Sequence, residues 1–105
     1  MQQRSRIYSE IFPDELMLEA FGTIMPTQAA KNEYFFNHWM IWKEHELKAT
    51  SNVTPNVFKK SVKEKCNQIG LREFWDYQTR GFSIRFKDAE LLAFFRISVG
   101  DQWTI

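Results

Sequence analysis

The sequence has little of what covalent or metal cross-links require. Cys66 is the only cysteine, so neither a disulfide framework nor a cysteine-based zinc cluster can form within one chain. The four glycines stand apart from one another, which excludes a glycine-rich phosphate-binding loop. No apolar run approaches the roughly 18 residues that suggest a membrane-spanning helix. We therefore expect no cofactor and no membrane partner.

The first ten residues, "MQQRSRIYSE", lack the apolar segment of a secretory signal. This favours a cytoplasmic location, which is the host-cell cytoplasm if the protein is phage-encoded. A chain of 105 residues is long enough for one hydrophobic core. We predict a single domain over residues 1–105, with a core module at about 28–87, a helical extension over 1–27, and a helix and tail over 88–105.

Charge is unevenly distributed along a chain whose formal net charge is only +1. Residues 1–47 hold 4 basic and 7 acidic side chains, residues 48–87 hold 9 and 3, and residues 88–105 hold 1 and 3, which gives nets of −3, +6 and −2. A basic block between acidic blocks is typical of a polyanion-binding surface on a nearly neutral protein. A solvated charged face is the simpler interpretation, so the geometry has to decide.

The aromatic content is high, at 16% with ten Phe and four Trp, and most of these rings must be core. Thr27 is placed to cap a long helix from Gln28 to Lys48. His38 and His45 lie on one side of it but are ~10 Å apart along the axis, too far to bind one metal ion. The apolar stripe of this helix consists of Phe35, Phe36, Trp39, Met40, Trp42 and Leu47.

The segment "TPNVFKKSVKEKCNQIG" predicts a second helix from about Pro55 to Ile69. Thr54 is the N-cap, Pro55 the first helical residue and Gly70 the C-terminal stop. Its buried stripe is Phe58, Val62, Cys66 and Ile69. The neighbouring arc contains no acidic residue and holds Asn56, Lys59, Lys60, Lys63 and Asn67. Lysines bind phosphates and asparagines bind phosphates or base edges, so this arc suits nucleic acid, although a solvated lysine face is the alternative.

The segment "REFWDYQTRGFSIRF" predicts two strands joined at "QTRG". Alternation places the apolar residues on a face that packs on the helices and gives the other face Arg80, Arg85 and Lys87. Phe74 breaks the alternation, and is a bulge, a contact to a helix, or an exposed ring able to stack on a base.

Two further helices complete the predicted fold. "FPDELMLEAFG" predicts a short helix with Pro13 in its first turn and Gly22 as its stop. "KDAELLAFFRISVG" predicts a last helix with Asp88 as N-cap and Gly100 near its end, although "AFFRIS" could instead be a strand. The predicted class is therefore mainly α with a β-hairpin (α+β), winged-helix-like, with three to four helices and a two-stranded wing.

The aromatic-rich helix "NEYFFNHWMIWKEHEL", the helix of residues 54–70 and the hairpin together resemble the winged-helix-like module that follows the helicase part of D5-type primase-helicases. They look most like the C-terminal region of a phage primase-polymerase. This resemblance implies a fragment of a larger replication protein, whose primase and helicase domains are its partners and which holds template DNA. It also implies phosphate contacts by Lys59, Lys60 and Lys63 and wing contacts by Arg80 and Arg85.

We therefore expect a DNA-binding module, for single-stranded or duplex template, and not an enzyme, because no catalytic constellation is recognisable. The alternative is a small protein-interaction module, such as an inhibitor of a host factor or an oligomerisation domain. The DNA hypothesis requires the basic residues of the 55–69 helix and of the hairpin to form one continuous surface. Its candidate contacts are Asn56, Lys59, Lys60, Lys63, Asn67, Arg80, Arg85 and Lys87.

Overall fold

The structure is a computed structural model, and it describes residues 14–100. Contacts divide the chain into two units, Met1–Phe36 and Asn37–Ile105, which we describe separately. Residues 1–13 of the expected N-terminal extension and residues 101–105 of the expected tail lie outside the described part.

The first unit contains α2, Asp14–Phe21, and the first part of α3, Gln28–Ile41. Asp14 and Glu15 lie in the first turn of α2, where the helix dipole favours negative charge. Gly22 follows α2 with φ 69°, a backbone conformation that glycine adopts without strain. The ring of Phe21 contacts the ring of Tyr34, with centroids 5.0 Å apart.

The predicted helix over Gln28–Lys48 is wrong in its last turns. α3 ends at Ile41, a 3₁₀ turn η1 covers Trp42–His45, and the strand β1 covers Glu46–Lys48. Leu47 pairs with Ile84 of a strand far along the chain, so tertiary pairing overrides the local helix propensity. Of the predicted apolar stripe, Phe35, Trp39 and Trp42 are buried, Leu47 is half-buried, and Phe36 and Met40 are exposed.

The second helix, α4, covers Pro55–Gln68 and confirms the local signals. The Thr54 hydroxyl accepts a hydrogen bond from the backbone N–H of Val57 at 3.4 Å, which satisfies one of the free donors of the first turn. Gly70 has φ 84° and follows the helix. Phe58, Val62 and Cys66 are buried as predicted, whereas Ile69, the fourth residue of the predicted stripe, lies just after the helix and is half-buried.

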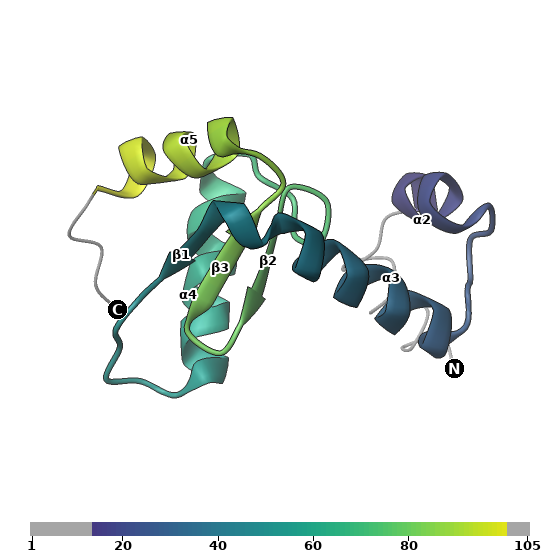
Figure 1. Ribbon diagram of the computed structural model, residues 1–105, viewed down its shortest axis with the longest axis horizontal. Coiled ribbons are helices and arrows are strands. Elements are labelled where there is room, and N and C mark those ends of the chain that lie inside the picture. The colour runs from purple at the N-terminus through teal and green to yellow at the C-terminus, as the bar shows by residue number, and fades with distance from the viewer. Residues whose placement is uncertain (1–13, 101–105) are drawn as a thin grey trace. The chain divides into compact units, whose positions relative to one another are not determined.

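An antiparallel sheet of three strands follows, with the order β1-β3-β2. The hairpin strands are β2, Tyr77–Arg80, and β3, Ser83–Phe86, which confirms the predicted ribbon; the third strand was not expected. Gly81, at the turn between them, has φ 57°. Figure 1 shows α4 on one face of this sheet.

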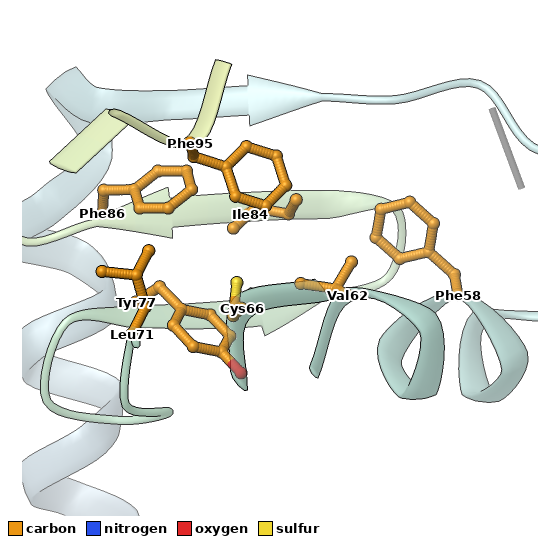
Figure 2. Close-up of a cluster of buried hydrophobic side chains, with 8 residues drawn as sticks. All are labelled: Phe58, Val62, Cys66, Leu71, Tyr77, Ile84, Phe86 and Phe95. Carbon is orange, nitrogen blue, oxygen red and sulfur yellow. The ribbon is translucent and has the colours of Figure 1, made fainter. Parts of the chain in front are cut away.

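The last helix, α5, covers Ala89–Val99. The Asp88 carboxylate accepts a hydrogen bond from the backbone N–H of Leu91 at 2.9 Å, so the expected N-cap is confirmed and the strand alternative is excluded. The core lies between α4, the sheet and α5 (Figure 2) and consists of Phe58, Val62, Cys66, Leu71, Tyr77, Ile84, Phe86 and Phe95. Burial raises the pKa of the Cys66 thiol to about 12, as expected for a cysteine that serves as a small apolar side chain.

The α+β class is therefore confirmed, with helices and one antiparallel sheet in the described part. Residues 42–54, between α3 and α4, contain η1, β1 and a loop, whereas a helix-turn-helix joins its two helices by about three to four residues. None of the helices within residues 14–100 combines the length and the apolar character that crossing a membrane demands.

Candidate nucleic-acid interface

The lysine arc of α4 is the set Asn56, Lys59, Lys60, Lys63 and Asn67. The structure keeps these residues on one side of the helix because α4 runs unbroken from Pro55 to Gln68, and 3.6 residues per turn brings their positions together. Lys63 is half-buried and the other four are exposed. Within residues 14–100, none of the three lysines lies within 4.0 Å of a carboxylate oxygen.

Glu73 lies close to the lysine arc without forming an ion pair with it. Burial raises the pKa of the Glu73 carboxyl, and the charges of Lys59 and Lys63 oppose part of that rise. Its Oε2 atom is buried and has no hydrogen-bond partner among the described residues. Glu73 therefore holds its proton to a higher pH than an exposed glutamate would.

The turn of residues 72–76 connects α4 to β2 and carries two aromatic side chains. Asp76 organises it: the backbone N–H of Arg72 donates to the Asp76 carboxylate at 2.7 Å, and the backbone N–H of Asp76 donates to the Arg72 carbonyl at 2.8 Å. Phe74 has φ 70° and donates its backbone N–H to the Tyr77 carbonyl at 2.7 Å. The irregular residue in the alternation is therefore part of a tight turn, and β2 begins only at Tyr77.

One cation lies over the first ring of this turn and two lie over the second. The ammonium nitrogen of Lys59 lies 6.0 Å from the centre of the Phe74 ring. The guanidinium of Arg72 lies 5.6 Å, and the ammonium of Lys87 5.5 Å, from the centre of the Trp75 ring. Arg72 is also 3.8 Å from the Asp76 carboxylate and remains 62% exposed. We call Lys59, Lys63, Arg72, Phe74, Trp75 and Lys87 the basic aromatic turn.

Arg85 has a different environment from the one predicted. Its Nε donates to the Glu46 carboxylate at 2.8 Å, and one terminal nitrogen donates to the Trp39 carbonyl at 2.7 Å. Its guanidinium lies 4.2 Å from the centre of the Trp39 ring, and its side chain is only 16% exposed. The guanidinium is committed to internal contacts, so we do not retain Arg85 as a nucleic-acid contact.

The expectation of one continuous surface over α4 and the hairpin is also wrong, so the DNA hypothesis fails in the form that required it, and only α4 and the turn after it can carry a narrower one. Tyr77 pairs with Phe86 and Gln78 with Arg85; since the first pair belongs to the core beneath α4, the second must point away from α4. Arg80 is exposed and lies on that second face, with its guanidinium 5.4 Å from the Trp39 ring. The sheet thus separates Arg80 and Arg85 from the lysine arc, whereas Lys87, beyond the end of β3, joins the Trp75 ring.

Sequence reasoning did not select Arg72, Glu73 or Trp75. The i,i+4 spacing of Arg72 and Asp76 was a usable signal, because such a pair can close a turn as well as stabilise a helix. Glu73 had no signal, since its importance arises from burial next to lysines of another element. Within residues 14–100, no cluster of three or more His, Cys, Asp or Glu side chains could hold a metal ion.

Comparison of the chain with protein families, with characterised proteins and with solved structures found no match. The function is therefore argued from the geometry of the lysine arc and the basic aromatic turn.

Proposed function

We propose that this protein binds nucleic acid through the lysine arc of α4 and the basic aromatic turn. The observation that carries the proposal is that Lys59, Lys60 and Lys63 share one side of a helix without an ion pair to any described carboxylate. Surface helices usually intersperse charges of both signs, because like charges at this spacing repel. A polyanion relieves that repulsion, and each lysine that meets a phosphate releases condensed counterions.

The order of elements supports the same proposal. Helix α4 immediately precedes the β2–β3 hairpin, and a winged-helix-like arrangement would place this helix against the DNA while the hairpin touches the backbone. Arg80, at the end of β2, lies on the face of the sheet away from α4, so the wing contact predicted for it is not part of this proposal. The long connection over residues 42–54 departs from a helix-turn-helix, so α4 is assigned on its charge and not on the geometry of that motif.

We further propose a binding role and not a catalytic one, in the cytoplasm. The role of an accessory module in a phage replication protein, with primase or helicase activity elsewhere in a parent chain, rests on the sequence resemblance alone. It stays a prediction.

A protein-interaction role is the second candidate, and one feature favours it. Helix α5 exposes Phe94 by 44% and Ile97 by 83%, and apolar side chains at i and i+3 lie on one side of a helix. Such a pair could contact a protein partner.

Salt dependence separates the two candidates. Fluorescence anisotropy of labelled single-stranded and duplex DNA, titrated with the protein at low and at physiological ionic strength, measures both affinity and its salt dependence. We expect affinity to fall steeply with salt, with a slope close to the number of phosphates neutralised. Absence of binding at low salt would contradict the proposal, and a salt-insensitive complex with a protein partner through α5 would favour the alternative.

A further inference from the structure

The basic aromatic turn offers flat apolar faces beside positive charge. Phe74 and Trp75 are both half-buried, so each residue keeps some solvent-accessible surface. Lys59 lies next to the first ring, and Arg72 and Lys87 lie next to the second. A nucleotide in a single strand has the complementary parts. Its base can stack on an aromatic ring, and the phosphate of the adjoining backbone carries negative charge.

The backbone at Phe74 has an unusual conformation. Its φ of 70° lies in the left-handed region, where glycine or asparagine fits with less strain than a bulky side chain. Phe74 is the only residue other than glycine with positive φ within residues 14–100. Strain of this kind persists where the surrounding structure holds it, here the Phe74–Tyr77 hydrogen bond and the Arg72–Asp76 contacts, and it concentrates at functional sites.

The charges next to the rings select the kind of ligand. Aromatic side chains can also bind ammonium ligands, because the face of the ring attracts a cation. Here Lys59, Arg72 and Lys87 already approach the rings and would repel a cationic ligand. An anionic ligand with flat faces is favoured instead.

We propose that Phe74 and Trp75 stack on bases of single-stranded nucleic acid while Lys59, Lys63, Arg72 and Lys87 contact its phosphates. The inference rests on the proposed function and deepens it by naming the strand state. In a duplex both faces of each base are covered by neighbouring bases, so these rings gain contacts only with an unpaired strand. The turn therefore discriminates single strands from duplexes through stacking, and the lysines bind both.

The test compares ring removal with ring exchange. Phe74→Gly removes the ring and suits the positive φ, and Trp75→Leu removes the second ring but keeps an apolar side chain; Phe74→Tyr and Trp75→Phe keep an aromatic face. Anisotropy titrations use labelled oligothymidylate of about 12 nucleotides, close to the site sizes of known single-strand binders, and a duplex of equal length. Circular dichroism verifies that each variant is folded.

We expect the first two variants to bind oligothymidylate roughly five- to a hundredfold more weakly and the duplex nearly as well as the unchanged protein. The salt slope should stay the same, because no phosphate contact is removed. Phe74→Tyr and Trp75→Phe should retain single-strand affinity. Equal single-strand affinity in the folded Phe74→Gly and Trp75→Leu variants would overturn the stacking proposal while leaving nucleic-acid binding intact. Absence of binding by the unchanged protein would overturn both.

Discussion

Two groups of cations next to aromatic rings lie in the same unit and differ in what surrounds them. At Trp39, Arg85 is held by the Glu46 carboxylate and by a backbone carbonyl, and both charged side chains are 16% exposed. At the basic aromatic turn, Lys59 has no described carboxylate within 4.0 Å, and Arg72 stays 62% exposed beside Asp76.

The comparison shows that an arginine or lysine next to a ring does not by itself indicate a binding site. A buried guanidinium whose donors are already used stabilises the fold, because its desolvation is offset by fixed partners. An exposed cation keeps donors available to a ligand. Four variants test this division between a structural group and a ligand-binding group.

The largest effect is expected at Trp39, the ring that the structural group surrounds. Trp39→Ala removes a side chain that is 6% exposed and should lower the free energy of unfolding by roughly 3 to 5 kcal/mol, since it is a large-to-small change in the core. Urea denaturation followed by circular dichroism measures the loss. Trp39→Phe keeps a ring and should lose much less; a Trp39→Ala variant as stable as the unchanged protein would show that this group is not structural.

The second effect concerns Arg85 itself. Arg85→Ala removes the hydrogen-bonded partner of the largely buried Glu46 carboxylate and leaves it only the exposed Lys48 ammonium, 3.7 Å away, so we expect a loss of about 2 to 3 kcal/mol in unfolding free energy. DNA affinity of the folded protein should change by less than about twofold. The matched control is Lys87→Ala, which removes one positive charge from an exposed position and should change stability by less than about 0.5 kcal/mol.

The third effect is on binding, and stability should be nearly unchanged. Replacing Lys59, Lys60 and Lys63 by alanine should weaken single-strand and duplex binding alike and flatten the salt slope by about one unit per lost contact. Lys43→Ala is the control, because Lys43 is an exposed lysine outside the arc. A folded triple variant with unchanged DNA affinity would show that these lysines do not bind DNA. The distinction between structural and ligand-binding cations would then fail.

The smallest effect is expected at Glu73. Glu73→Gln removes a negative charge near Lys59 and Lys63, and the attraction of a solvated lysine to a carboxylate is worth about 0.2 to 1 kcal/mol, so DNA affinity at neutral pH should rise by up to roughly fivefold. Anisotropy titrations over a pH series measure it.

The direction of the pH dependence follows from the raised pKa of Glu73. As pH falls through that pKa, the carboxyl becomes neutral and DNA binding should tighten, and Glu73→Gln should abolish this change. Stability follows the same direction: the contribution of Glu73 is present below its unfolded pKa and is lost as pH rises through the folded pKa. A pH response equal in both proteins would assign it to another group.

The helices and hairpin were largely predictable, because their signals are local. Thr54 and Asp88 cap their helices through their own side chains, and strict alternation after Gly81 defines β3. β1 was not predictable, because "ELK" has no strand pattern of its own and pairs with a strand nearly forty residues away in the sequence.

The candidate site was predictable only in part. The lysine arc follows from helical periodicity, which a sequence displays directly. The engagement of Arg85 depends on a contact with Glu46, 39 residues away, and the conformation of Phe74 depends on backbone hydrogen bonds. The order of residues shows that Phe74 breaks the strand alternation, but it does not show the conformation of Phe74 or the partner of Arg85. Contacts between residues far apart in the sequence thus determine which of the predicted cations can still bind a ligand.

The turn at Gly81 has a consequence for how this sequence tolerates insertions. Its position makes Ser83 oppose Arg80 and Ile84 oppose Thr79. Adding or deleting one residue there would exchange the two faces of β3, placing Arg85 against Phe58 and turning Ile84 towards Trp39. A single inserted residue would thus bury a guanidinium and abolish its ion pair at once, so length variation should be far better accepted in the loop before Thr54 than at this hairpin tip.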